Sequence, residues 1–253
     1  MGRSRNAAWW VAWLGAAYLV THFVSAAAGE ALPGGAQTTA ELFQKVAPSV
    51  VTIRARGRDV MSGGQTRLTE TGSGVLVSRD GHVLTAAHVV HGMDEISVEF
   101  PSGVTVSARV VASEPTAADV SLLQLDDVPP GSIVAPMADS NTVKVGDKVL
   151  VVGAPAGLPP SASVGSISAR WAPNTVYLTM PLAEFFETDV TIDTANSGGP
   201  MFNLQGEIIG IVSLNVAKGD RSEWRSFAVV TLNTTKEMLL GTRPMWLGAT
   251  LSD

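Results

Sequence analysis

The chain has 253 residues, of which 45% are hydrophobic and 16% charged. This is enough apolar material for one large domain or two small subdomains, and it excludes disorder as the state of the main body. The net charge of −6, with no cluster of Lys and Arg, disfavours nucleic acid as a partner. The absence of cysteine excludes disulfides, cysteine-ligated zinc and thiol catalysis.

The N-terminal residues predict export from the cytoplasm. Arg3 and Arg5 precede an apolar stretch at residues 7–24, and Ala26-Ala27-Ala28 fits a small-residue cleavage site. Two outcomes stay open at this stage. Residues 1–28 are a signal peptide cleaved near Ala28, or residues 7–24 are retained as a membrane anchor, since about 17–25 residues span a bilayer. The composition of residues 29–38 is that of a flexible linker.

The first half of the chain predicts a short helix followed by strands. The helix covers Thr39–Val46, is capped by Thr38 or Thr39, and ends before Pro48. Arg56 to Thr71 is predicted to be a polar loop. Strand patterns occur at Ser49–Arg54, Gly74–Val77, His82–Thr85, Ile96–Phe100, Val104–Val111 and Val120–Leu125.

Pro129-Pro130-Gly131 interrupts this pattern, and the chain up to Gly146-Asp147 is predicted to connect two halves. A helical pattern at Thr234–Leu240, with Gly241 after it, closes the domain. About six short strands per half indicate β-barrels or sandwiches. The strand patterns of the second half occur at Val149–Val152, Ser163–Ala169, Thr175–Thr179, Phe185–Thr188, Pro200–Asn203, Glu207–Asn215 and Trp224–Val230.

Three segments carry the residue types of nucleophilic hydrolysis. Ser197 lies in the sequence Thr-Ala-Asn-Ser-Gly-Gly-Pro, which suits a sharp turn that exposes a hydroxyl and aims backbone N–H groups at an oxyanion. His88 follows an apolar strand, and Asp119 leads into another. The chain order His, Asp, Ser is one of the known orders of the hydrolytic triad. A cleft between the two halves would bring the three together.

Each of these residues also has a simpler interpretation. Ser197 could lie in a glycine-rich surface turn, His88 could be a packed structural histidine, and Asp119 could start a strand. The other candidates of the same type fit less well. His82 lies at a turn, His91 at the expected end of a short helix, and Asp126 and Asp127 directly after an apolar strand.

Over roughly residues 39–241 the sequence resembles the trypsin-like serine proteases, and among them the HtrA (Deg) branch of exported quality-control proteases. The matching stretches are Thr71–Val77, Asp80–Thr85, His88–Val90, Ala118–Val120, Thr188–Pro200, Asn203–Ile211 and Ser226–Val229. The resemblance implies an all-β fold of two six-stranded antiparallel Greek-key barrels, the first at about 48–126 and the second at about 147–232. The active site would lie between them.

The resemblance also implies a function. Ser197 would be the nucleophile, His88 the general base and then acid, and Asp119 the group that orients the imidazole. The reaction would be hydrolysis of peptide bonds in unfolded or damaged proteins, outside the cytoplasm, without a metal or organic cofactor. Family members often form trimers through the protease domain, so a homotrimer is implied here as well.

The oxyanion hole would consist of Ala195, Asn196 and Ser197, with the backbone N–H groups of Ala195 and Ser197 as donors. The family normally has glycine in place of Ala195, and glycine adopts positive φ at little cost. Ala195 could therefore be harmless, slow the reaction or favour an inactive loop. By resemblance Thr191 lies at the base of the substrate pocket, which Phe227, Ala228 and Val229 line. This uncharged set favours small or medium aliphatic residues before the cut.

Residues 242–253 resemble the opening of the PDZ domain that usually follows in this family, and they could equally be an apolar tail packed on the barrel. Two rival functions remain. One is a non-catalytic protein that binds polypeptides through the same cleft, with Ala195 as its support. The other is a membrane-anchored scaffold.

Overall fold

The computed structural model describes residues 38–59, 66–154, 158–173, 175, 182–190, 196–217, 224–230, 234 and 239. The expected signal peptide or anchor and the PDZ-like tail lie outside these residues, as do the linker up to residue 37 and most of the expected C-terminal helix. Among the residues described, no helix is long and apolar enough to cross a membrane.

The predicted N-terminal helix is present as α1 (Thr39–Val46). Thr38 caps it: its hydroxyl accepts a hydrogen bond from the backbone N–H of Glu41, whose carboxylate accepts one from the N–H of Thr38. Leu42 and Val46 are buried, and Lys45 Nζ donates to the carbonyl of Gln205, 2.6 Å away in the second half of the chain. A short 3₁₀ turn (Ala47–Ser49) follows. The helix therefore ties the start of the first barrel to a turn of the second.

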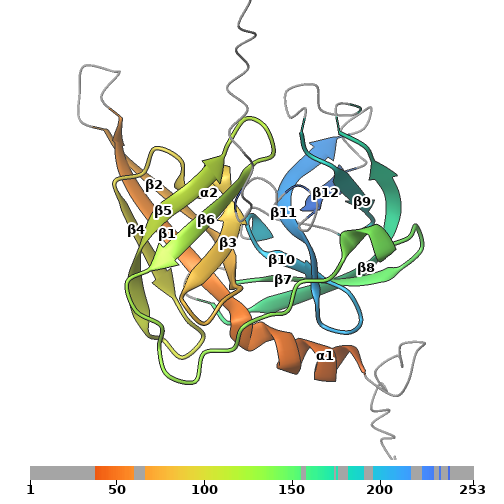
Figure 1. Cartoon of the computed structure of the whole chain (residues 1–253), viewed down its shortest axis with the longest axis horizontal. Helices are drawn as coiled ribbons and strands as arrows, with labels where there is room; N and C mark the ends of the chain where they lie inside the picture. The colour runs from red at the N-terminus through yellow and green to blue at the C-terminus, as the bar shows by residue number, and fades with distance from the viewer. Residues whose placement is uncertain are drawn as a thin grey trace, which may run out of the picture.

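The first half of the chain forms a closed six-stranded barrel in the order β1-β2-β3-β6-β5-β4 (Figure 1). The fourth strand returns beside the first, which is a Greek-key connection. A four-residue helix, α2 (Ala87–Val90), follows the third strand. The strands are β1 (Val50–Asp59), β2 (Thr66–Leu76), β3 (His82–Ala86), β4 (Glu95–Glu99), β5 (Thr105–Glu114) and β6 (Val120–Leu125).

The prediction of a loop from Arg56 to Thr71 was wrong at both of its ends. β1 continues to Asp59 and β2 begins at Thr66, with Arg56 opposite Thr69 in an uninterrupted antiparallel register. The polar side chains suggested a loop. Pairing of β1 with β2 nevertheless provides hydrogen-bond partners for the backbone N–H and C=O groups, whatever the side chains are.

The second half forms another closed barrel in the order β10-β11-β12-β9-β8-β7. β8 and β9 pair directly, so the barrel closes without the strand expected at Thr175–Thr179, most of which lies outside the described residues. Its strands are β7 (Lys148–Gly153), β8 (Ser161–Trp171), β9 (Phe185–Thr188), β10 (Pro200–Phe202), β11 (Ile208–Ala217) and β12 (Trp224–Val230).

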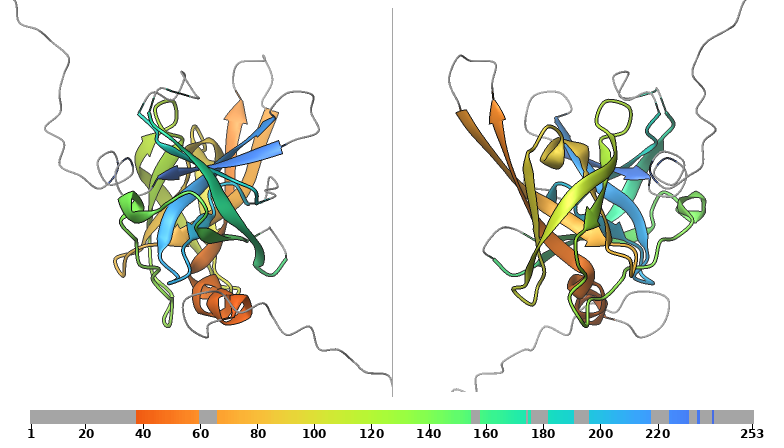
Figure 2. Two further views of the ribbon diagram at one scale, coloured as in Figure 1. Left: turned by 90° about the vertical axis from the view of Figure 1, so that its right-hand side faces the viewer. Right: turned by 60° about the vertical axis from the view of Figure 1, so that its left-hand side comes forward.

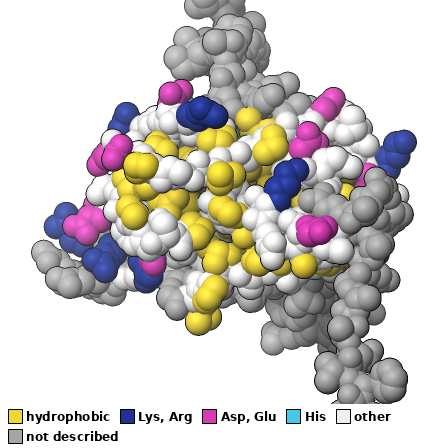
Figure 3. Space-filling view, turned by 90° about the horizontal axis from the view of Figure 1, so that it is seen from below, with side chains coloured by type: hydrophobic (Ala, Val, Ile, Leu, Met, Phe, Trp, Pro, Cys, Tyr) yellow, Lys and Arg dark blue, Asp and Glu magenta, His cyan; other side chains and the backbone are white. Residues whose placement is uncertain are grey.

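The two barrels lie side by side, and the views agree on this arrangement (Figures 1 and 2). One buried cluster extends across both, joining Val75 and Leu84 of the first barrel to Leu150 and Phe202 of the second. The expected all-β fold of two six-stranded barrels is therefore confirmed. The face seen from below, next to α1, exposes many hydrophobic side chains with charged ones toward its rim (Figure 3).

Candidate active site

Asp119 holds the beginning of the helix that carries His88. Ala86, at the N-cap position of α2, makes no side-chain capping bond. Asp119 supplies the missing acceptors from a distant part of the chain: its carbonyl accepts from Ala87 N at 3.1 Å, and its Oδ1 accepts from His88 N at 2.9 Å. Because the first N–H groups of a helix have no partner within it, these bonds fix where α2 starts.

The same carboxylate also binds the imidazole of His88. Asp119 Oδ2 lies 2.8 Å from His88 Nδ1, which leaves Nε2 as the ring nitrogen for proton transfer. The Asp119 side chain is 4% exposed, whereas that of His88 is 44% exposed. Asp119 adopts φ of +52°, a left-handed conformation that aspartate tolerates better than most residues. The backbone turn thus directs a buried carboxylate at an open histidine.

The environment raises the pKa of His88 above its ordinary value of 6.5. The largest cause is the hydrogen bond that the ring donates to Asp119, and burial of the ring opposes it. The negative charges of Asp119 and Glu70 raise the pKa further. The imidazolium that forms when His88 takes up a proton is therefore stabilised.

Asp119 has a further hydrogen-bond donor that the sequence did not predict. The hydroxyl of Ser213, on β11 of the second barrel, donates to Asp119 Oδ2 at 2.5 Å, and Ser213 is 3% exposed. The signal for it was a single hydroxyl within the apolar run Ile208 to Leu214. A buried polar side chain needs a partner, and here that partner is the carboxylate beside His88.

Ser197 begins a tight turn that is fastened to the second barrel. Gly198 adopts φ of +83°, which glycine reaches at little cost. Gly198 N donates to Val212 O at 2.7 Å, and Gly199 N donates to Asn196 O at 2.8 Å. Ser197 itself is partly exposed, while its neighbours on both sides are buried.

The turn is also fastened to the barrel that carries His88 and Asp119. Ser73 N, on β2, donates to Ser197 O at 2.8 Å. A Cβ on Gly198 would overlap Thr85 Oγ1 and Ser73 O. A Cβ on Gly72 would lie 2.8 Å from Ser197 O and 2.8 Å from Cγ2 of Val89, the residue after His88. Glycine at both positions therefore lets the Ser197 turn approach the strands and the helix around His88.

Buried hydroxyls hold this junction together. Ser73 is fully buried, and its Oγ accepts from Ala154 N at 2.8 Å, at the end of β7. Its carbonyl accepts from Thr85 Oγ1 at 2.8 Å. One residue of the first barrel thus contacts the Ser197 turn, a neighbouring strand and the second barrel. Sequence reasoning did not single out Ser73 or Thr85.

Comparison with known proteins places this arrangement in a family. Residues 72–211 match the family described as a trypsin-like peptidase domain. The chain belongs to the trypsin-like peptidase family. Its HtrA (Deg) character is supported by a probable periplasmic serine endoprotease, DegP-like, of Pseudomonas savastanoi pv. phaseolicola, which is 34% identical over 76% of this chain. The protein named serine protease HTRA2, mitochondrial, of Bos taurus is 36% identical over 71% of the chain.

Solved structures give the same result. An HtrA-type protease, AlgW with decapeptide, aligns with a TM-score of 0.66 and 27% identity over 79% of this chain and 66% of that one. The chain spans only 40% and 39% of the length of the two relatives named above. The resemblance to the HtrA branch is therefore confirmed for the peptidase domain.

The other predicted site residues of this trypsin-like peptidase are placed only in part. Asn196 is 6% exposed, and a Cβ on Gly153 would overlap its side-chain oxygen. Thr191 and Ala195 lie outside the described residues. Phe227, Ala228 and Val229 lie on β12, where their backbones pair with β9 and β11.

The competing histidines lack a carboxylate partner within the described part of the chain. His82 Nδ1 lies 3.1 Å from Ser78 Oγ, and His91 is exposed at the end of α2. The described residues contain no group of three or more His, Cys, Asp or Glu side chains that could hold a metal ion.

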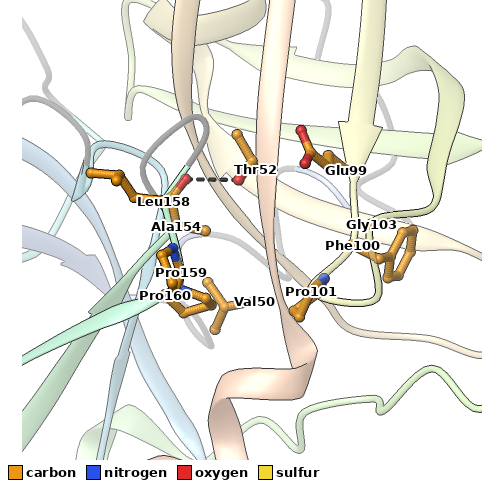
Figure 4. Close-up of a pocket in the computed structure, with 10 residues that line it drawn as sticks. All are labelled: Val50, Thr52, Glu99, Phe100, Pro101, Gly103, Ala154, Leu158, Pro159 and Pro160. Atoms are coloured by element: carbon orange, nitrogen blue, oxygen red, sulfur yellow. Dashed lines mark hydrogen bonds between the residues drawn. The ribbon is translucent and has the colours of Figure 1, made fainter.

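A cavity of about 320 Å³ lies where the two barrels meet, and His88 is not among its lining residues (Figure 4). Thr52 Oγ1 donates across it to the carbonyl of Ala154 at 2.9 Å. Its lining contains no histidine and no serine, and the carboxylate of Glu99 is paired with Arg54. The other lining residues are Val50, Glu99, Phe100, Pro101, Gly103, Leu158, Pro159 and Pro160.

Proposed function

We propose that this chain is a serine endopeptidase that hydrolyses peptide bonds of unfolded or damaged polypeptides. The proposal rests on the two hydrogen bonds that the Asp119 carboxylate accepts from His88. Asp119 accepts hydrogen bonds from both the backbone N–H and the ring Nδ1 of His88, while the Ser197 turn is hydrogen-bonded to β2 and packs closely against β3 of the same barrel.

The proposed reaction has two halves. The Ser197 hydroxyl attacks the scissile carbonyl carbon and its proton passes to His88 Nε2, giving a tetrahedral oxyanion. The oxyanion collapses, the C–N bond breaks, and His88 gives its proton to the leaving amine. Water then attacks the acyl-enzyme with His88 again as base, which releases the acid and restores Ser197. Asp119 stabilises the imidazolium in both halves.

The proposed oxyanion hole uses the backbone N–H groups of Ser197 and Ala195, with Asn196 between them. The N–H of Gly198 is already bonded to Val212 O and is not available as a donor. Loss of one such donor costs on the order of 10²–10³ in turnover, so the conformation of Ala195 decides the rate.

The proposed pocket for the residue before the cut combines Thr191 with Phe227, Ala228 and Val229. It carries no charge, so the protease should cut after small or medium aliphatic residues and disfavour basic ones. This assignment places the acyl half of the substrate against the second barrel, to which β12 belongs.

We further propose that the peptidase domain covers residues 39–241 and works outside the cytoplasm. The supporting observations are the export-like N-terminus and the relatives named as periplasmic. The domain would be soluble after cleavage near Ala28 or anchored by residues 7–24, and would act as a homotrimer, as is common in the HtrA branch.

Turnover of unfolded β-casein by the purified chain, with Ser197→Ala and Ala195→Gly variants beside it, tests the proposal. Cleavage by the parent and none by Ser197→Ala is the expected result, with Ser197 labelled by a fluorophosphonate. If the parent is inactive and the Ala195→Gly variant cleaves β-casein, the oxyanion hole of the parent is defective. If none of the three proteins cleaves β-casein or reacts with the fluorophosphonate, the chain is a polypeptide-binding protein or a scaffold instead.

A further inference from the structure

Glu70 lies on the face of β2 that looks toward the catalytic groups. Side chains alternate between the two faces of a strand, so Glu70, Gly72, Gly74 and Leu76 share one face. Leu76 is buried in the core of the first barrel, and the Cβ position of Gly72 meets Ser197 O and the Val89 side chain. Two residues correspond to about 6.6 Å along a strand. Glu70 is therefore the next side chain beyond the contact with the nucleophile turn.

Among the described residues, no neighbour neutralises the carboxylate of Glu70. Glu70 is exposed, and its cross-strand partner is the apolar Ala55. Two arginines of β1 already have acids: Arg54 pairs with Glu99 at 2.7 Å and Arg58 with Asp94 at 3.1 Å. Arg56, opposite Thr69, lies on the other face of the strand from Ala55 and Glu70. Within the described residues no ion pair or hydrogen bond of Glu70 is found, yet its charge reaches His88. An uncompensated negative charge therefore faces the site.

β2 also offers an open edge beside the nucleophile. It pairs with β1 from Thr66 to Val75, but with β3 only at Val75 and Leu76. Ser73 N points away from β1, to Ser197 O. Backbone groups alternate in direction along a strand, so those of Thr71 and Thr69 point the same way as those of Ser73. No described strand pairs with that edge, and an extended peptide can add to such an edge.

The leaving half of the substrate is the half that would run along this edge. The acyl half occupies the proposed pocket in the second barrel. The chain after the cut must therefore continue over the first barrel, which carries His88, the donor of the proton to the leaving amine. Residues that follow the scissile bond then pass Glu70.

We propose that Glu70 selects substrates that carry lysine or arginine within the first two residues after the scissile bond. The inference rests on the proposed function and adds to it a preference that the uncharged pocket of the second barrel does not supply. The interaction joins a partly solvated acid to a flexible cation, which is a weak pair in water. It is worth about a two- to fivefold preference in kcat/KM.

Peptide pairs test the proposal. Each pair has the same aliphatic residue before the cut and differs only by lysine or glutamate at the first or second position after it. The parent chain should favour the lysine peptide about two- to fivefold in kcat/KM, a quantity that includes the step in which the leaving group departs. Glu70→Gln should abolish the preference, and Glu70→Lys should reverse it. Added salt should weaken it in the parent.

Glu95→Gln is the matched control. Glu95 is an exposed acid on β4 of the same barrel and is not among the charges that act on His88, so this variant should keep the parent's ratio. The ratio between paired peptides also separates selection from an effect on His88, which would change both peptides alike. Equal ratios in the parent and Glu70→Gln would overturn the proposal.

A different result would show that the proposed peptidase function is wrong. A chain that neither cleaves nor takes a fluorophosphonate on Ser197 is not a serine peptidase. The same peptide pairs, followed by fluorescence anisotropy, then report the charge preference in binding alone. Tighter binding of the lysine peptide that disappears in Glu70→Gln supports the role of Glu70, and equal binding refutes it.

Discussion

Ser213 and Asp119 come from different barrels, and the hydroxyl of the first donates to the carboxylate of the second at 2.5 Å. Asp119 Oδ2 is also the oxygen that binds His88 Nδ1. The orientation of the imidazole in the first barrel therefore depends on a side chain of β11 in the second. The proposed base is aligned only when the two barrels are packed together.

Ser213→Ala should slow hydrolysis without unfolding the protein. The change removes one charge-assisted hydrogen bond and leaves the two bonds between Asp119 and His88. A hydrogen bond to a charged group contributes about 1.5–3 kcal/mol, so we expect kcat/KM to fall about tenfold or more. The measurement is kcat/KM on a fluorogenic peptide, with the rate of fluorophosphonate labelling as a second readout.

Ser213→Thr is the control for this prediction, since it keeps the hydroxyl at the same position. It should retain most of the activity that Ser213→Ala loses. Equal activity of the parent and the alanine variant would show that the contact with Asp119 contributes nothing to orienting His88.

The raised pKa of His88 should set the acid limb of the pH profile. His88 must be neutral to accept the proton of Ser197, so kcat/KM should rise with a midpoint above pH 6.5, the ordinary value for histidine. Asp119→Asn should move that midpoint to lower pH and reduce kcat on the order of 10⁴. Glu70→Gln should move it in the same direction by less, because its charge is the smallest of the causes that raise this pKa. A midpoint at or below 6.5 in the parent contradicts the prediction.

Protonation of His88 should increase the stability of the fold, although it lowers the activity. A pKa that is higher in the folded protein means that protonation of His88 favours folding. Its contribution is fully present below about pH 6.5, the unfolded value, and is lost as the pH rises through the folded pKa. The difference in unfolding free energy between the parent and His88→Gln, measured in urea, should therefore shrink from pH 5 to pH 9. A difference that does not change with pH would refute this.

The sequence was informative where a local pattern is sufficient. The helix Thr39–Val46 has its capping residue and apolar positions within eight residues, and the structure has the same bounds. Asp119 and His88 could be paired in advance because each ends or begins an apolar strand. Their juxtaposition needs only that β3 and β6 be neighbours, as they are.

Contacts between segments distant in the chain could not be predicted from the sequence. Ser213 looks like any residue of an apolar strand until β11 is set against Asp119, 94 residues away. The extension of β1 and β2 past Arg56 depends on pairing and not on side-chain polarity. Glu70 was part of that expected loop, and its position beside the Ser197 turn follows only from the register of β2.

Ser73→Ala should weaken both folding and activity. The hydroxyl is buried and is the acceptor for Ala154 N, so its removal leaves that N–H buried without this partner. Such a loss costs about 1–3 kcal/mol in unfolding free energy. Labelling of Ser197 should also slow, because β2 is no longer held to Ala154 at this point and Ser73 N, which donates to the carbonyl of Ser197, can shift with the strand.

Ser49→Ala is the comparison for that variant in urea unfolding and labelling. Its hydroxyl is also buried but donates to Val46 O at the end of α1, and within the described residues Ser49 makes no hydrogen bond to the Ser197 turn. We expect Ser49→Ala to leave the labelling rate unchanged. Equal labelling by the parent and Ser73→Ala would mean that the junction has no influence on the nucleophile turn.

Gly198→Ala and Gly131→Ala form a matched pair, because both glycines have φ of +83°. Left-handed backbone costs an alanine about 1–2 kcal/mol at either site. At Gly131 no heavy atom lies within 4 Å of the new Cβ, so that cost is the whole effect. At Gly198 the Cβ overlaps Thr85 Oγ1 and Ser73 O, and the turn must move away from the first barrel.

Gly198→Ala should therefore lose more stability than Gly131→Ala, by about 1–3 kcal/mol as expected for overpacking, and should lose fluorophosphonate labelling of Ser197. Gly131→Ala should label like the parent. Urea unfolding gives the first comparison, and the labelling rate of the folded variants gives the second. If the two variants were equally stable and equally reactive, the close approach of the Ser197 turn to Thr85 and Ser73 would not be what holds the nucleophile in place.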